Sequence, residues 1–179
     1  MDFQSPCTLR HGKVRCIYLD PPNVKPMSAR KLRRPRKSVK SAGEFASRTR
    51  RHRVLLIEDH AELAEATAEL MRSERLEVLI ASTGESGLEM AKAFQPDIVL
   101  CDIRLPDMTG LEVARALRAI PGTKDALIAL HTALSERDLR TFEREADTSV
   151  NVFVSKPLTP EKLDGILTQF NVLRRSRPF

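Results

Sequence analysis

Acidic side chains stand at the ends of two apolar runs in this sequence. The run 54–57 is followed by Glu58 and Asp59, and the run 98–101 is followed by Asp102. Short, continuously apolar runs are typical of strands that are covered on both faces in a parallel sheet, and ligands bind at the carboxyl edge of such sheets. Adjacent carboxylates repel each other unless a cation offsets their charge. The pattern therefore predicts a Mg2+ site, because magnesium prefers oxygen ligands and keeps part of its water shell.

A hydroxyl and a primary amine are predicted to reach the same edge. The fourth apolar run ends at His131 and Thr132, and the fifth ends next to Lys156. Simpler explanations exist for single residues: Asp59 could only cap the following helix, and Lys156 could belong to a structural ion pair. They explain poorly why acids, a hydroxyl and a lysine each close a different strand. The combination therefore indicates a functional site.

The segments between the apolar runs must supply the helices that hold these strand ends together. The runs begin at regular intervals, near Val54, Glu77, Asp97, Ala126 and Asn151, which suits repeated βα units in one domain. Helix starts are predicted by capping pairs, which are Ser82 with Glu85, Thr109 with Glu112, and Thr159 before Pro160. Right-handed crossovers then require a parallel sheet with helices on both faces. The predicted fold class is a doubly wound α/β domain.

Charge divides the chain into two parts near Arg53. Residues 1–53 contain 15 Lys and Arg against 3 Asp and Glu, a net charge of +12, whereas residues 54–179 contain 15 against 21, a net charge of −6. The first part has few apolar residues and no helical period, so we expect a disordered basic tail. Its run 28–40 has the character of an interaction arm. A solvated tail without function, or a true start near Met27, would explain the same composition.

The cysteines and the hydropathy indicate in which cellular compartment the protein is expected. Cys7, Cys16 and Cys101 are odd in number and widely spaced, which fits reduced thiols and no disulfide framework. No stretch approaches the roughly 18 consecutive apolar residues of a membrane span, and residues 1–13 lack the apolar core of a signal peptide. We therefore expect a cytoplasmic protein without a transmembrane segment.

Residues 54–173 resemble the receiver domain of bacterial two-component response regulators. The resemblance rests on Glu58 and Asp59, on Asp102 within DIRLPDMTG, on Thr132 within LHTA and on Lys156 within SKP. It implies a flavodoxin-like (βα)5 fold with the parallel sheet order 2-1-3-4-5, which the spacing of the apolar runs also suggests. The chain would then comprise a basic tail (1–53), a receiver domain (54–173) and a short carboxyl-terminal tail (174–179).

The resemblance also implies a role for each residue of the site. Asp102 would be the phosphoacceptor, Glu58 and Asp59 would hold Mg2+ together with Asp102 and the backbone carbonyl of Arg104, and Lys156 and Thr132 would meet the phosphoryl oxygens. The Asp102 carboxylate would act as a nucleophile and form an aspartyl phosphate that water later removes. Such a transfer needs positioning and charge neutralisation. We therefore expect a phosphoprotein of signal transduction and not an enzyme.

The expected partners follow from the same resemblance. A sensor histidine kinase or a phosphotransfer protein would donate the phosphoryl group in a phosphorelay. Because only residues 174–179 follow the predicted fifth helix, we expect a single-domain response regulator that signals by docking. A downstream target protein would bind the surface formed by the fourth helix, the fifth strand and the fifth helix. The fourth helix, predicted at 135–146, is mostly charged.

A nucleic-acid-binding protein is the alternative function. In that case the basic tail would contact phosphates, and the receiver domain would tune the contact. Stacking platforms for bases need aromatic rings, and the tail offers only Phe3, Tyr18 and Phe45, so docking is favoured. The tail could also bind an anionic membrane surface or fold back on the acidic domain.

Some positions leave their role open. His131 precedes Thr132, so a shift of one residue would put an imidazole in the place of the hydroxyl, although the threonine is favoured. Phe153 lies where family members have a moving aromatic side chain, and a simple core aromatic is the alternative. The family also has a cis bond at the position between Lys156 and Pro157.

Two further positions bear on the lifetime of the phosphorylated state. Arg104 and Leu134 lie two residues after Asp102 and Thr132, where members of the family vary that lifetime. Because both side chains are bulky, we expect the phosphoryl group to be lost slowly.

Overall fold

The computed structural model of the chain describes residues 17–18, 51–133 and 148–175. Its strands are, in chain order, β1 (Ile17–Tyr18), β2 (Arg53–Ile57), β3 (Glu77–Ala81), β4 (Ile98–Asp102), β5 (Leu127–Thr132) and β6 (Val152–Ser155). Its helices are α1 (Ala61–Ser73), α2 (Gly84–Phe94), α3 (Gly110–Ala119) and α5 (Pro160–Arg175). The helix predicted at 135–146 lies outside the described residues.

The strands form one parallel sheet with the order β1-β6-β5-β4-β2-β3. Because β2 is the first of the five predicted strands, the part β3-β2-β4-β5-β6 has the predicted order 2-1-3-4-5, and the predicted fold class is confirmed. Each of these strands starts within one residue of its predicted position. The apolar runs locate β2, β4, β5 and β6 well because most of their side chains are buried, whereas the edge strand β3 buries only Val78 and Ala81.

Strand β1 lies within the tail that the composition predicts to be disordered. Its backbone pairs in parallel with β6, with Ile17 opposite Val152 and Tyr18 opposite Phe153. Without it, β6 would be an edge strand, and the unpaired N–H and C=O groups of an edge accept another segment. Such pairing depends on backbone groups, so tail composition does not reveal it. The rest of residues 1–50 lies outside the described part of the chain.

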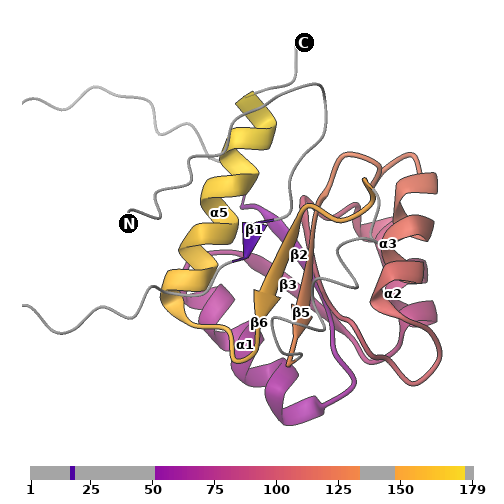
Figure 1. Cartoon of the computed structure of the whole chain (residues 1–179), viewed down its shortest axis with the longest axis horizontal. Coiled ribbons are helices and arrows are strands. Elements are labelled where there is room, and N and C mark those ends of the chain that lie inside the picture. The colour runs from indigo at the N-terminus through magenta and orange to yellow at the C-terminus, as the bar shows by residue number, and fades with distance from the viewer. Residues whose placement is uncertain (1–16, 19–50, 134–147, 176–179) are drawn as a thin grey trace, which may run out of the picture.

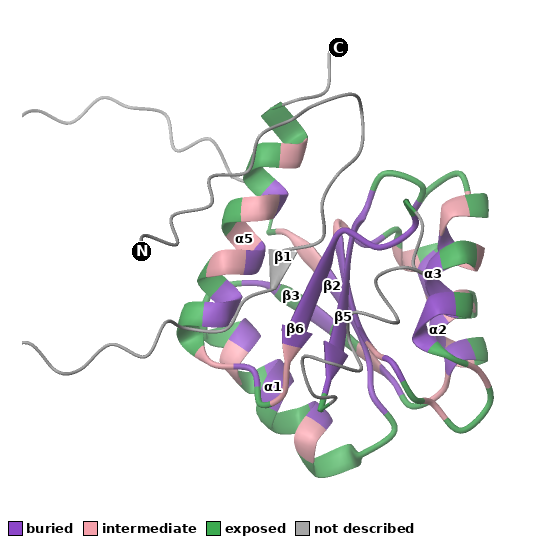
Figure 2. Cartoon of the chain, in the orientation of Figure 1, coloured by how far each residue is buried: buried purple, intermediate pink, exposed green. Residues whose placement is uncertain are grey.

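Helices cover both faces of the sheet, with α1 and α5 on one face and α2 and α3 on the other (Figure 1). Side chains along each strand alternate between the two faces, so the sheet is buried on both sides (Figure 2). The face toward α2 and α3 buries Leu55, Ile57, Val99, Cys101, Ile128, Leu130 and Phe153. The face toward α1 and α5 buries Val54, Leu56, Leu100, Ala129, Val152 and Val154.

Two of the three predicted helix starts are confirmed. Thr109 and Glu112 form a capping box at α3, and the Lys162 amide lies 3.4 Å from the Thr159 hydroxyl at α5. The start predicted from Ser82 and Glu85 is wrong, because the cap of α2 is Thr83, whose hydroxyl accepts a hydrogen bond from the Ser86 amide.

The start of α2 is held by the backbone of Thr83 and by a residue that is distant in the sequence. Thr83 has the extended backbone of a capping residue, and the amides of Gly84 and Glu85 both donate to the carboxylate of Asp107, at 2.9 and 2.8 Å. The helix therefore begins one residue later than the spacing of Ser82 and Glu85 predicts. No helix in the described part of the chain is long and apolar enough to cross a membrane.

Candidate functional site

Four neighbouring strands deliver the predicted site residues to one edge of the sheet. Glu58 and Asp59 follow β2, Asp102 ends β4, Thr132 ends β5, and Lys156 follows β6. The strand register keeps these ends level, since Asp102 lies opposite His131 and Thr132 lies opposite Ser155. The structure therefore brings together the residues that the sequence pattern selects.

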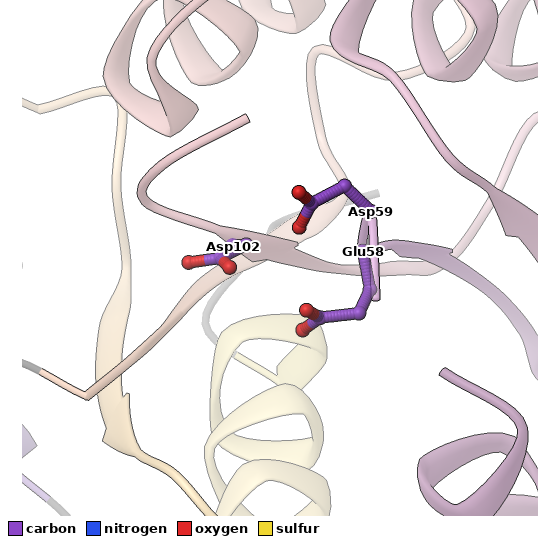
Figure 3. Close-up of side chains that lie close together, drawn as sticks. All are labelled: Glu58, Asp59 and Asp102. Atoms are coloured by element: carbon purple, nitrogen blue, oxygen red, sulfur yellow. The ribbon is translucent and has the colours of Figure 1, made fainter. Parts of the chain in front are cut away.

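Three carboxylates converge at this edge. Glu58, Asp59 and Asp102 each offer an oxygen, and these oxygens lie within 4.8 Å of one another (Figure 3). Asp59 is exposed, Asp102 is partly buried, and Glu58 is only 2% exposed. Asp59 is not the cap of α1, because the Leu63 amide donates to the imidazole of His60 instead. The carboxylate of Asp59 therefore remains available for another role.

Lys156 joins two of the acids. Its ammonium lies 2.7 Å from Asp102 Oδ2, and 2.9 and 2.7 Å from the two carboxylate oxygens of Glu58. Partial burial works to lower the pKa of Lys156, but the hydrogen bonds to Asp102 and Glu58 outweigh it and raise the pKa above its usual value. Lys156 is therefore charged over the whole physiological pH range.

At Glu58, burial is the strongest influence on the pKa. Desolvation raises the pKa of Glu58 above its usual value, and the hydrogen bond from Lys156 only partly counteracts this. With all groups ionised, three carboxylates and one ammonium leave two negative charges at the edge. A set of closely spaced oxygens with this charge fits a hard divalent cation such as Mg2+.

The loop after Asp102 is held close to the strand end. The Arg104 amide donates to Asp102 Oδ1 at 3.2 Å, and the Gly110 amide donates to the Ile103 carbonyl at 2.8 Å. A Cβ on Gly110 would lie 2.4 Å from the Asp102 carbonyl oxygen, so only glycine fits at the start of α3. The sequence pattern did not single out Gly110, although its place directly after the Thr109 cap was a usable signal.

A second lysine, Lys162, was also missed. Its ammonium donates to the carbonyls of Ser155 and Pro157, at 3.0 and 3.2 Å, and so ties the first turn of α5 to both sides of Lys156. The bond between Lys156 and Pro157 is cis, as the family resemblance implies. Lys162 is buried, and a lysine in a sequence gives no signal of such a contact.

His131 and Thr132 are both buried at the end of β5. Alternation along the strand places Thr132 on the same face as Leu130, and His131 on the opposite face with Ala129. His131 Nδ1 lies 4.0 Å from a carboxylate oxygen of Glu58. Burial, and then the charge of Lys156, lowers the pKa of His131 to about 4. The imidazole is therefore neutral at physiological pH.

The parallel sheet and its acidic edge define a class of protein. Residues 54–168 match the model of the response regulator receiver domain, and the chain belongs to this family. The match covers the strand ends described above. Receiver domains are components of two-component signalling and not classical enzymes.

Individual relatives support the assignment. The chain is 31% identical over 125 residues to the cell cycle transcriptional regulator CtrA of Caulobacter vibrioides, an alignment that covers 70% of this chain and 52% of CtrA. It therefore spans about half the length of the curated relatives that it matches. A putative response regulator from Chloroflexus aurantiacus has 28% identity and a TM-score of 0.62, with 70% of this chain and all of that chain covered.

A magnesium-bound receiver domain is among the similar structures. It belongs to the sensor histidine kinase PA1611 of Pseudomonas aeruginosa and has 25% identity and a TM-score of 0.61, with 67% of this chain and 97% of that chain covered. Its magnesium ion is coordinated in the active site cleft. The acidic edge of the present chain offers three carboxylates, a type of ligand that Mg2+ prefers.

Proposed function

We propose that this protein accepts a phosphoryl group on Asp102 from a sensor histidine kinase or a phosphotransfer protein. The observation that carries the proposal is the position of the Lys156 ammonium, which lies 2.7 Å from Asp102 while it also binds the buried Glu58. A cation fixed at this distance neutralises charge on the acceptor and on an incoming phosphoryl group. Glu58 and Asp59, with Asp102 and the Arg104 carbonyl, would hold Mg2+.

The chemistry needs little beyond position and charge. An oxygen of the Asp102 carboxylate attacks phosphorus, a P–O bond forms, and the P–N bond to the donor histidine breaks with its electron pair left on the imidazole. Lys156 and the Thr132 hydroxyl lie at the ends of neighbouring strands and would hold the phosphoryl oxygens. Bound magnesium would supply further positive charge for the phosphoryl oxygens. Water later removes the group from Asp102.

Signal output would occur by docking. In this proposal the side chains of Thr132 and Phe153 move toward the phosphoryl group. The surface formed by the fourth helix, β6 and α5 then binds a downstream target protein. We place this signalling in the cytoplasm, where kinase and target are reached without a membrane span. The bulky Arg104 and Leu134 would make the phosphorylated state long-lived.

The test is the intact mass of the protein after incubation with Mg2+ and acetyl phosphate, and separately with a phosphorylated histidine kinase. One added phosphoryl group is expected for the wild type and for Asp164→Asn, a control in which an exposed acid of α5 is changed. No added mass is expected for Asp102→Asn. If Asp102→Asn gains the group as readily as the wild type, the acceptor is another residue and the proposal is wrong.

Nucleic-acid binding by the basic tail is a second candidate function, favoured by the net charge of +12 over residues 1–53. Phosphate contacts release counterions, so binding that depends on the tail should weaken steeply with salt. The measurement is the affinity for a labelled duplex between low and physiological salt, with and without residues 1–50. A salt response that is flat, or that survives the deletion, contradicts this candidate.

A further inference from the structure

The most unusual group near the site is the imidazole of His131. It is 0% exposed, and within residues 51–133 and 148–175 neither of its ring nitrogens has a hydrogen-bond partner. Buried polar groups in folded proteins are nearly always paired, because an unpaired one loses its bonds to water without compensation. A leucine of similar size would bury no polar atom and would avoid that cost, so the imidazole calls for an explanation.

His131 lies directly beneath the acidic edge. On β5 it is the register partner of Asp102 on one side and of Val154 on the other. Its Nδ1 faces the carboxylate of Glu58 at 4.0 Å, which is about one ångström too long for a hydrogen bond. The charged groups that act on it are Glu58 and Asp102 together with the ammonium groups of Lys156 and Lys162.

The contacts of Glu58 explain why His131 Nδ1 stays 4.0 Å from its carboxylate. Both of its carboxylate oxygens already receive the ammonium of Lys156, at 2.9 and 2.7 Å. While Lys156 stays there, the carboxylate has a strong donor and His131 has no role. A neutral imidazole, however, carries one N–H that can donate, and Nδ1 is the ring nitrogen next to Glu58.

We propose that His131 is a positioning residue that donates a hydrogen bond from Nδ1 to Glu58 when Lys156 is drawn away to a phosphoryl group on Asp102. The inference rests on the proposed function for the event that moves Lys156. The exchange keeps the buried carboxylate of Glu58 paired and oriented toward the metal site in the phosphorylated state. Among the residues that the structure describes, His131 thus has no hydrogen-bond partner in the resting protein, and it gains one in the phosphorylated protein.

The exchange can be tested without phosphorylation, because Lys156→Met removes the competing ammonium directly. The urea midpoint of unfolding is measured in EDTA for the wild type, His131→Leu, Lys156→Met and the double variant. In the wild-type background, His131→Leu is expected to leave the midpoint unchanged or to raise it. In the Lys156→Met background, the same change is expected to lower it. An equal loss in both backgrounds means that His131 only fills space, and the proposal is overturned.

A second readout uses the phosphorylated protein. His131→Leu is expected to lower the steady-state fraction of phosphorylated protein with acetyl phosphate at least threefold, and His131→Gln, which keeps an N–H donor, is expected to restore most of it. Equal fractions in the leucine variant and the wild type contradict the proposal. If the wild type gains no phosphoryl group at all, the proposed function fails, and the unfolding cycle still decides the role of His131.

Discussion

The close approach of α3 to Asp102 makes Gly110→Ala the sharpest test of how the site is built. A Cβ at this position would lie 2.4 Å from the Asp102 carbonyl oxygen, 3.0 Å from Leu130 Cδ2 and 3.1 Å from the Cα of Ile103. Two of these three neighbours are backbone atoms, which cannot turn aside. Either α3 must move and stretch the hydrogen bond from the Gly110 amide to the Ile103 carbonyl, or the end of β4 must move and displace Asp102.

The size of the effect follows from this geometry. Overpacking of a well-packed site costs about 1–3 kcal/mol, partly offset by the better helix propensity of alanine, which is worth up to about 1 kcal/mol. The net cost is then about 1–2 kcal/mol. With a dependence on urea of about 2 kcal/mol per molar, we expect the unfolding midpoint to fall by roughly 0.5–1 M. Phosphorylation of Asp102 should slow as well, because its carboxylate must keep its position relative to Lys156.

The assay is urea unfolding followed by circular dichroism, combined with the rate of mass gain from acetyl phosphate. Gly122→Ala is the matched control, because its Cβ would meet only the flexible side chain of Gln95, at 3.0–3.2 Å. If Gly110→Ala and Gly122→Ala have the same midpoint and the same rate, the contact between α3 and β4 does not constrain the site, and the reasoning is refuted.

Three further predictions concern charged residues. Lys156→Met removes the only ammonium that the described residues place on the buried carboxylate of Glu58, and a neutral imidazole at His131 cannot replace its charge. The free energy of unfolding in EDTA should therefore fall by about 3–5 kcal/mol, and a fall below roughly 1 kcal/mol in a denaturant titration would contradict the buried ion pair. The amides at the start of α2 hold the pKa of Asp107 below its usual value, so its contribution to stability is present above the unfolded value and is lost as the pH falls through the folded one. Asp107→Ala should therefore unfold at a lower midpoint than the wild type at pH 7, and the two curves should converge below about pH 3.8; a constant difference down to pH 2 rules this out. Arg104→Ala should shorten the lifetime of the phosphorylated state severalfold in Mg2+ buffer, as followed by intact mass, whereas an unchanged lifetime would show that this side chain does not shield the site.

Sequence pattern was sufficient for five of the six strands of the sheet and for the position of the polar residues at its edge. Apolar runs such as 54–57 are buried on both faces, so their positions are dictated by hydrophobicity, and their ends carry the acids and Lys156 to one place. Two kinds of contact were not predictable: pairing between backbone groups, and the burial of a single charged side chain. The pairing of β1 with β6 uses backbone groups, and Lys162 is bound to carbonyls of Ser155 and Pro157. Neither leaves a periodic signature.

The orientation of side chains was the other feature that could not be predicted from the sequence. Alternation along a strand already predicts that His131 and Thr132 face opposite sides, but only the folded sheet shows which side each of them faces. Likewise, Ser82 and Thr83 both suit a helix cap, and the choice between them depends on the backbone angles of Thr83 and on the distant Asp107. Competition between neighbouring residues of similar chemistry is therefore decided by tertiary contacts.

The hydrogen bonds of Lys162 couple the position of α5 to the backbone around Lys156. They clamp the first turn of the helix to the carbonyls on either side of Lys156, so the backbone of Lys156 cannot shift while α5 stays in place unless these bonds break. The helix has 16 residues and, at about 1.5 Å per residue, is roughly 24 Å long. A tilt of about 5° at the clamped end would carry the far end by about 2 Å over that length. A displacement too small to alter the phosphorylation site would thus be magnified at the distant end of α5.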